Sequence, residues 1–257
     1  MPFTEVSSVP GNEPAPGSKS DPKTADFSGD VAVSDEVPSK EMIEKAADIT
    51  IVDTDGKEMP FKSLYTPSGE SGDQGEKRTL VIFIRHFFCG SCQDYIRFLV
   101  QAIPPSSLPP STSLVIVGCG THTLIKMYAD ETSCPYPIYA NPSRSLYDIF
   151  GMLKTMSLGT QPEYIKGSLP SYIARGIMQA FRRIGAGDVL KGGDSRQVGG
   201  EFLFTAGGAG EETSNPEAKV TWCHRMKNTR DHSSLAEIKG QLGISAESEG
   251  EKAKPST

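Results

Sequence analysis

Hydrophobic positions along the chain change their period several times, and each change predicts an element. Residues Thr79 to Arg85 form a near-continuous apolar run, which is typical of a strand covered on both faces. From Cys92 to Ile103 the apolar positions, among them Tyr95 and Leu99, follow a helical period, and Pro104 ends it. The pattern therefore predicts a buried strand that leads directly into a helix.

This strand and helix pattern occurs twice more. Ser113 to Gly118 reads as a second buried strand, and a helix with Leu124 and Tyr128 on its inward face follows it. Pro137 to Ala140 and Arg144 to Gly151 form the third pair of strand and helix. Such alternation indicates a largely parallel sheet with helices on both faces.

Both ends of this region depart from the alternation. A short helix, Glu41 to Ala47, precedes two strand-like segments, Ile49 to Val52 and Glu58 to Leu64, which read as a hairpin around the Asp55-Gly56 turn.

At the other end, Glu201 to Phe204 and Lys219 to His224 read as strands joined by a Gly-rich loop, and Ser234 to Leu242 reads as a closing helix. A parallel half followed by an antiparallel hairpin and a helix is the thioredoxin-like order. We expect an α/β fold of this type, with a central mixed sheet flanked by helices.

Composition sets the domain limits. Residues 1–39 and the tail 244–257 are rich in Pro, Gly, Ser and acidic residues and hold little apolar surface, so we expect both to be disordered. The thioredoxin-like domain is predicted over residues 40–243. It contains an insertion at about 152–193, centred on an amphipathic helix near residues 170–184, which packs on the sheet or forms a lid.

Charge and hydropathy exclude several classes of function. The formal net charge is −6, and basic residues are mixed with acidic ones, so a nucleic-acid partner is not expected. No apolar run approaches the roughly 20 residues of a membrane span, and the first residues do not resemble a secretory signal. We expect a cytoplasmic protein. Its five cysteines are expected to be reactive or metal-binding thiols and not a disulfide scaffold.

The Cys89-Gly90-Ser91-Cys92 motif is the strongest chemical signal. It lies where the buried strand gives way to the helix, so helix N-H groups and the helix dipole favour a thiolate there. Two cysteines at this spacing can also close a small disulfide. The motif therefore predicts a redox-active dithiol, and we expect Cys89 and Cys92 to be catalytic.

Other residues qualify as parts of the same site. Arg85 could lower a thiol pKa, and His86 could move a proton, although each has a purely structural alternative. Cys119 ends the second strand, where α/β sheets open to ligands, and it is a candidate secondary redox or substrate residue, unless it is simply core. Arg225 is a candidate for holding an anion or polarising a peroxide.

Alternatives to redox chemistry remain open from the residues alone. Cys223 and His224 could complete a zinc set with the CxxC cysteines, although a second CxxC is missing, and either thiol of the motif could be inert core. Cys134 and Cys223 are further candidates for resolving an oxidised partner. No metal and no cofactor is expected.

The residues around the motif suggest a family. The run Val81 to Tyr95, which contains Arg-His-Phe-Phe-Cys-Gly-Ser-Cys, resembles the peroxiredoxin-like proteins of the AhpC/TSA antioxidant-enzyme group. The segments Gln197 to Phe202 and Arg225 to Leu235 resemble the final hairpin and helix of the same group. The resemblance implies a thioredoxin fold and thiol-based reduction of a peroxide-type or disulfide substrate.

It also implies thioredoxin or glutathione as electron donor. Thioredoxin chemistry favours Cys89 as the attacking thiol. Ordinary peroxiredoxins carry Thr or Ser three residues before the attacking cysteine, and alignment to them favours Cys92, with Cys89 in the Thr position. The alternative function is a non-catalytic thioredoxin-like adaptor or redox switch.

Overall fold

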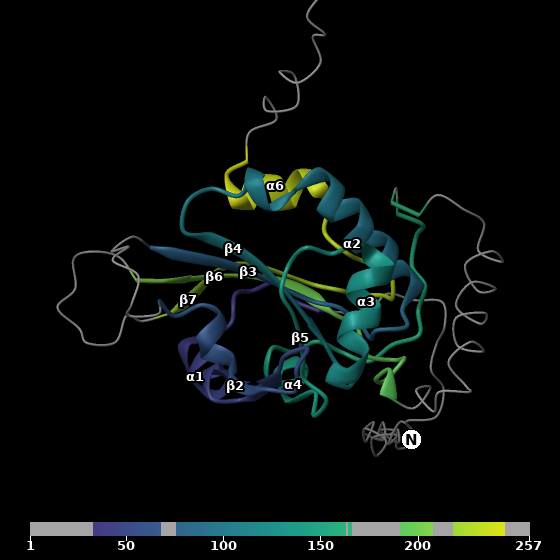
Figure 1. The fold of residues 1–257 in the computed structure, drawn as a ribbon, viewed down its shortest axis with the longest axis horizontal. Helices are drawn as coiled ribbons and strands as arrows, with labels where there is room; N and C mark the ends of the chain where they lie inside the picture. The colour runs from purple at the N-terminus through teal and green to yellow at the C-terminus, as the bar shows by residue number, and fades with distance from the viewer. Residues whose placement is uncertain (1–32, 68–75, 163, 166–190, 208–217, 245–257) are drawn as a thin grey trace, which may run out of the picture.

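One mixed sheet with helices on both faces forms the centre of the computed structural model (Figure 1). The structure describes residues 33–67, 76–162, 164–165, 191–207 and 218–244. In the described residues the sheet has seven strands in the order β2-β1-β5-β4-β3-β6-β7. Their bounds are β1 Thr50–Val52, β2 Glu58–Pro60, β3 Lys77–Phe83, β4 Thr112–Gly118, β5 Ile138–Ala140, β6 Gly200–Ala206 and β7 Lys219–Arg225.

Strand direction divides the sheet into two parts. β4 runs parallel to β3 and to β5, whereas β6 runs antiparallel to β3 and to β7. On the other edge, β1 and β2 form the predicted antiparallel hairpin. Two parallel strands followed by an antiparallel hairpin, in the spatial order β4-β3-β6-β7, confirm the thioredoxin-like fold expected from the sequence.

Helices cover the sheet in two groups (Figure 1). Their bounds are α1 Lys40–Ala47, α2 Gly90–Ala102, α3 Ile125–Thr132, α4 Ser145–Ile149 and α6 Leu235–Leu242, with short 3₁₀ turns at Phe61–Leu64, Pro105–Ser107 and His122–Leu124. One face of the sheet packs on α2, α3 and α6, and the other packs on α1 and α4. Within the described residues no helix is long and apolar enough to cross a membrane.

The continuous apolar run predicted around residues 79–85 is now explained. Side chains of a strand alternate between faces, so Leu80 and Ile82 of β3 join the core under α2, while Val81 and Phe83 join the core on the other face. Both faces are buried from Thr79 to Phe83, which accounts for the apolar residues from Leu80 onward.

The structure describes part of the predicted N-terminal arm but not the predicted inserted helix or the C-terminal tail. The amphipathic helix near residues 170–184 lies outside the described residues, as does the tail from residue 245 onward. Residues 34–36, assigned from composition to the N-terminal arm, contact the end of β7: the Arg225 guanidinium donates hydrogen bonds to the carbonyls of Ser34 and Glu36 at 2.6 and 2.8 Å.

The backbone passes very closely between β3 and β6 at Gly199. A Cβ atom placed on Gly199 would lie 1.8 Å from the carbonyl oxygen of Phe83. Only glycine fits there. This contact holds the start of β6 against the end of β3, directly before the segment that carries the cysteine motif.

Candidate functional site

The two motif cysteines sit where β3 turns into α2. β3 ends at Phe83, and Cys89 is the N-cap residue of α2, in extended conformation at φ −74° and ψ 107°. Its sulfur takes the role that a Ser or Asp oxygen usually plays at a helix start, because it accepts the backbone N-H of Cys92 at 3.3 Å. The sequence prediction that the motif begins the helix is therefore confirmed in position.

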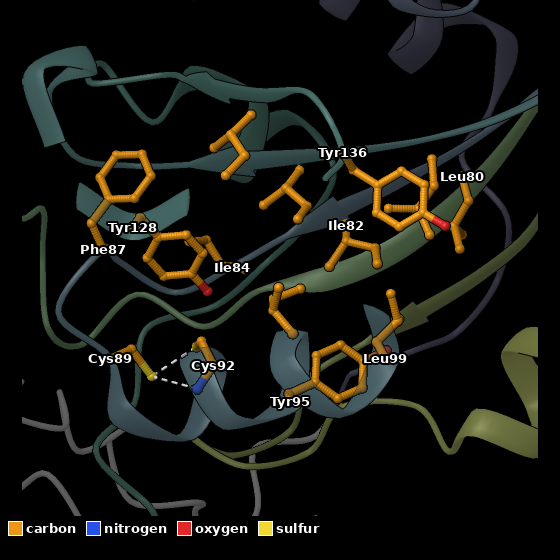
Figure 2. Close-up of a cluster of buried hydrophobic side chains, with 14 of the residues drawn as sticks. Leu80, Ile82, Ile84, Phe87, Cys89, Cys92, Tyr95, Leu99, Tyr128 and Tyr136 are labelled. Carbon is orange, nitrogen blue, oxygen red and sulfur yellow. Dashed lines mark hydrogen bonds between the residues drawn. The ribbon is translucent and has the colours of Figure 1, made fainter. Parts of the chain in front are cut away.

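Four hydrogen-bonding groups surround the sulfur of Cys89. Besides the backbone N-H of Cys92, the thiol of Cys92 lies at 2.7 Å, the hydroxyl of Ser91 at 3.2 Å, and Nη1 of Arg85 at 3.5 Å. Figure 2 shows the pair at one end of the apolar cluster, with Tyr95 further along the same helix. A sulfur with so many donors and a neighbouring cation is suited to hold a negative charge.

The charge of Cys89 follows from this environment. Burial opposes a thiolate, because the residue is only 3% exposed. The hydrogen bond from Cys92, the positive charge of Arg85 and the hydrogen bond from Ser91 outweigh that penalty and hold the pKa of Cys89 well below its ordinary value.

Cys92 has the opposite protonation. Its side chain is fully buried, and burial together with the neighbouring Cys89 thiolate raises the pKa of Cys92 well above the usual range. The two cysteines are free thiols in the structure. One ionised sulfur and one protonated sulfur at 2.7 Å form an arrangement that can close a disulfide with a small movement.

Arg85 faces the site and not the solvent, which removes its structural alternative as an exposed strand-end charge. Only 7% of the residue is exposed. Its Nε donates to the carbonyl of Gln197 at 3.2 Å, and its Nη2 donates to the carbonyl of Ser195. These two contacts with the 191–197 loop fix the guanidinium and direct Nη1 toward Cys89.

His86 lies next to the thiolate in a different charge state from Arg85. Burial lowers the pKa of His86 to about 4, and the Cys89 charge only partly offsets that effect. The imidazole is therefore neutral at pH 7, and Arg85 supplies the permanent positive charge. A neutral imidazole can accept a proton during thiol chemistry.

Cys119 lies beside the same segment but with a different role. Its thiol donates to the backbone carbonyl of Arg85 at 2.8 Å, and burial raises the pKa of Cys119 to about 11. The side chain packs with the core on the face of α1 and α4. The structure thus makes Cys119 a support for the Arg85 backbone and leaves it protonated.

Arg225 is not brought to the cysteine pair. Its side chain stacks over Phe202 at 5.4 Å and donates to the carbonyl of Phe150 at 2.6 Å, on the face away from α2. Those bonds, with the two to residues 34 and 36, occupy the guanidinium. The structure therefore does not bring Arg225 to the thiols, and its side chain joins β7 to the N-terminal segment and to the end of α4.

The zinc alternative is not assembled either. Cys223 points to the core opposite the motif, and its thiol contacts the carbonyls of Asp35 and Glu36. In the part of the chain that the structure describes, no three His, Cys, Asp or Glu side chains are grouped to hold a metal ion. Cys134 packs against the core cluster that holds the motif, and burial raises the pKa of Cys134 to about 11.

A buried polar pair under α2 was missed by the sequence reasoning. Nδ1 of His232 lies 2.9 Å from Oε1 of Glu201, and both side chains are fully buried. The ring of His232 stacks on Tyr95, one helical turn after Cys92, with ring centres 4.0 Å apart. His232 and Tyr95 also line a cavity of about 310 Å³. The available signal was a glutamate in an apolar strand.

The family of the chain is shown by comparison with known proteins. Residues 99–228 match the family described as AhpC/TSA antioxidant enzyme, beginning within α2 after both motif cysteines. Peroxiredoxin-like 2C of Homo sapiens is 26% identical over 202 residues, covering 77% of this chain and 79% of the relative. Peroxiredoxin-like 2C of Takifugu rubripes is 28% identical over 197 residues, covering 74% and 76%.

Plant and bacterial proteins also match. Thioredoxin-like protein AAED1, chloroplastic, of Arabidopsis thaliana is 22% identical over 151 residues, covering 59% of this chain and 56% of the relative. Among solved structures, a peroxiredoxin-like protein from Aquifex aeolicus is 11% identical, with a TM-score of 0.43 over 84% of this chain and 89% of that one. Peroxidoxin BcpB from Mycobacterium tuberculosis is 13% identical, with a TM-score of 0.41 over 77% and 92%.

The resemblance noted from the sequence is thus confirmed at the level of family: the chain belongs to the AhpC/TSA antioxidant enzyme family, with a peroxiredoxin-like, thioredoxin-type fold.

Proposed function

We propose that this protein is a thiol oxidoreductase that reduces a small peroxide, with Cys89 as the attacking thiolate and Cys92 as the resolving thiol. The observation that carries the proposal is the environment of Cys89: an N-cap sulfur at 3.5 Å from the Arg85 guanidinium and at 2.7 Å from a protonated Cys92. This environment favours Cys89 over Cys92 as the nucleophile, because the thiolate is the reactive form.

In the first step, the Cys89 thiolate attacks the terminal oxygen of a peroxide ROOH. The S-O bond forms as the O-O bond breaks, Cys89 becomes a sulfenic acid, and the leaving alkoxide takes a proton to give ROH. In the second step, the Cys92 sulfur attacks the sulfenic sulfur, and a disulfide and water form. The two oxidation equivalents of the peroxide are then held in the Cys89-Cys92 disulfide.

A reductant completes the cycle. Thioredoxin or glutathione supplies two thiols, which are oxidised to a disulfide while the Cys89-Cys92 disulfide is reduced to two thiols. The burial of the pair favours a small peroxide over a protein disulfide as the oxidising substrate, because Cys89 is only 3% exposed and Cys92 is fully covered.

The test is a stopped-flow reaction of the reduced protein with hydrogen peroxide, in wild type, Cys89→Ser and Cys92→Ser. We expect a second-order rate above that of free cysteine in wild type and in Cys92→Ser, and loss of that rate in Cys89→Ser. In Cys92→Ser the sulfenic acid should persist and be trapped at Cys89 by a dimedone-type probe.

Other outcomes have defined meanings. Trapping at Cys92 in Cys89→Ser, with a rate equal to wild type, would reverse the assignment of the two thiols. A rate no faster than free cysteine in all three proteins would remove the peroxidase proposal and support disulfide exchange or a non-catalytic, redox-switch adaptor.

A further inference from the structure

Arg85 is paired with Cys89 without competition from a carboxylate. Its other side-chain bonds go to two neutral acceptors, the backbone carbonyls of Gln197 and Ser195. None of the ion pairs among the described residues involves Arg85. This matters because a carboxylate would bind the guanidinium more strongly than a thiolate at 3.5 Å and would weaken its effect on Cys89.

Yet a carboxylate is present next to one of those carbonyls. Asp194 precedes Ser195 in the chain, its side chain is only 14% exposed, and its negative charge acts on His86. Asp194 is therefore close enough to influence the charges of the site. Its own charge is retained: burial opposes it, but hydrogen bonds from Arg196 and the charges of Arg196 and Arg144 hold the pKa of Asp194 below its ordinary value.

Two arginines share Asp194, and they are not equivalent. Nη1 of Arg144 lies 2.6 Å from Oδ2 of Asp194, and the Arg144 side chain is 33% exposed. Arg196 contacts the same carboxylate at 3.3 Å from a side chain that is 66% exposed. The Arg144 contact is shorter and better shielded from water, whereas Arg196 makes more contacts with the carboxylate, including its backbone N-H at 2.9 Å, and contributes more to lowering the pKa of Asp194.

The backbone of Arg144 is unusual as well. Arg144 has φ 63° and ψ 10°, in the left-handed region, where a non-glycine residue is uncommon. A glycine would adopt this conformation without cost, so the presence of arginine calls for a reason in its side chain. The contact with Asp194 is the charged contact that its side chain makes in the described residues.

We propose that Arg144 is a positioning residue for the thiol chemistry: by neutralising Asp194, it keeps this carboxylate from pairing with Arg85, so that Arg85 stays on Cys89. The inference rests on the proposed function only in that Cys89 is the working thiolate. Arg144 itself touches neither sulfur, and it acts through Asp194 and Arg85.

The pKa of Cys89 can be measured separately from the pKa values of the other cysteines. Burial raises the pKa values of Cys92, Cys119, Cys134 and Cys223, so Cys89 alone forms a thiolate well below pH 9. Thiolate absorbance near 240 nm, or the rate of alkylation by iodoacetamide against pH, then reports the pKa of Cys89. The readout requires neither peroxide nor a reductant.

Arg144→Gly is the informative variant, because glycine keeps the φ 63° backbone unstrained and removes only the side chain. We expect the pKa of Cys89 to rise by about one unit, which lowers the alkylation rate about tenfold below that pKa. The double variant Arg144→Gly/Asp194→Asn should return the rate to within about threefold of wild type, and Arg144→Lys should keep most of it.

The control is Arg196→Ala, which removes an exposed side chain but keeps the backbone N-H of residue 196 on the same carboxylate, and it should change the rate by less than about threefold. The inference is overturned if Arg144→Gly leaves the Cys89 pKa unchanged. It is also overturned if the double variant is as impaired as Arg144→Gly, because a purely structural role would not be rescued by removing Asp194. A normal pKa response together with no peroxide reaction would instead reject the proposed function alone.

Discussion

The imidazole of His232 and the carboxylate of Glu201 lie 2.9 Å apart with both side chains fully buried. Glu201 occupies an inward position of β6, opposite Ile82 of β3, in a strand whose every residue is buried. The hydroxyl of Ser233 donates to the second carboxylate oxygen at 3.4 Å. Each buried polar atom of Glu201 therefore has a partner supplied by the segment between β7 and α6.

Removing only one member of this pair should destabilise the protein strongly. Glu201→Leu leaves Nδ1 of His232 buried without an acceptor, and we expect the free energy of unfolding to fall by about 3 kcal/mol. The double variant Glu201→Leu/His232→Phe should recover most of the loss, because phenylalanine can still stack on Tyr95 and no imidazole is left without its acceptor.

Urea denaturation at pH 7 measures both effects. Glu58→Gln, on the exposed edge strand β2, is the control and should change stability by less than about 0.5 kcal/mol. If the double variant were less stable than Glu201→Leu, the loss would come from other contacts of the imidazole, such as its stacking on Tyr95, and not from a stranded Nδ1.

Arg85→Met should raise the pKa of Cys89, because it removes the permanent positive charge beside the thiolate. The expected effect on iodoacetamide alkylation at pH 7 is a decrease of about tenfold or more. The pH profile should move toward alkaline pH, since the thiolate then forms only at higher pH.

Arg97→Met is the control, because Arg97 lies in α2, the helix that Cys89 caps, and also donates to a backbone carbonyl, but its charge is paired with Asp94. It should leave the Cys89 profile in place. Equal profiles for wild type and Arg85→Met would show that the helix N-terminus and the neighbouring hydrogen bonds suffice to ionise Cys89.

Two histidines should make stability depend on pH with opposite signs. The pKa of His86 is lowered to about 4, so the folded protein binds fewer protons than the unfolded chain between about pH 6.5 and 4, and stability falls as the solution is acidified. We expect a loss of about 2 kcal/mol between pH 7 and pH 5 from this group. The pKa of His224 is raised by Glu201, Asp231 and Asp35 despite burial, so its stabilisation is present below about pH 6.5 and is lost as pH rises through its folded value.

Proton NMR of the imidazoles resolves the two groups, with His86→Gln and His224→Gln as the assigning variants. The His86 variant should lose the acid-side decrease in unfolding free energy that wild type shows. A His86 resonance that titrates near pH 6.5 would contradict the neutral imidazole beside Cys89.

Two glycines should respond to the same substitution in opposite directions. Gly199→Ala places a methyl group 1.8 Å from the Phe83 carbonyl, so we expect a loss of more than about 3 kcal/mol or failure to fold. Gly240→Ala, inside α6 with no atom within 4 Å of the new Cβ, should stabilise the protein by about 0.5–1 kcal/mol.

Thermal unfolding followed by circular dichroism measures this pair of variants. The comparison also separates local contact from general effects of removing glycine, because both variants make the same chemical change. A mild effect at Gly199 would mean that β6 can move away from β3 at low cost.

Much of this architecture was predictable because the spacing of apolar residues along the chain follows which side chains are buried. The apolar run that became β3 and the helical spacing of Tyr95 and Leu99 each have one physical interpretation, and the CxxC motif could be placed at a strand-to-helix junction from them alone. The helix predicted at residues 144–151 is shorter, Ser145–Ile149, because the backbone is left-handed at Arg144 before it and at Gly151 after it.

The partners of charged side chains were not predictable from the sequence. Arg85 and Arg225 have similar local settings at strand ends, yet one binds Cys89 and the other binds backbone carbonyls of residues far away in the chain. The Glu201-His232 and Arg144-Asp194 pairs join residues 31 and 50 positions apart. Such pairings arise from the topology of the sheet, which spacing along the chain does not encode.

The attachment of the N-terminal segment to β7 has a consequence for how the sequence can vary. Arg225 binds the carbonyl oxygens of Ser34 and Glu36, which every amino acid supplies, and it requires nothing of the side chains there. Only Asp35, whose carboxylate accepts the Arg225 backbone N-H at 2.7 Å, contributes a side chain to the contact at β7. Substitutions at positions 34 and 36 should therefore accumulate freely, while a substitution of Arg225 would remove both guanidinium contacts at once and leave the segment held by Asp35 and by the Cys223 thiol.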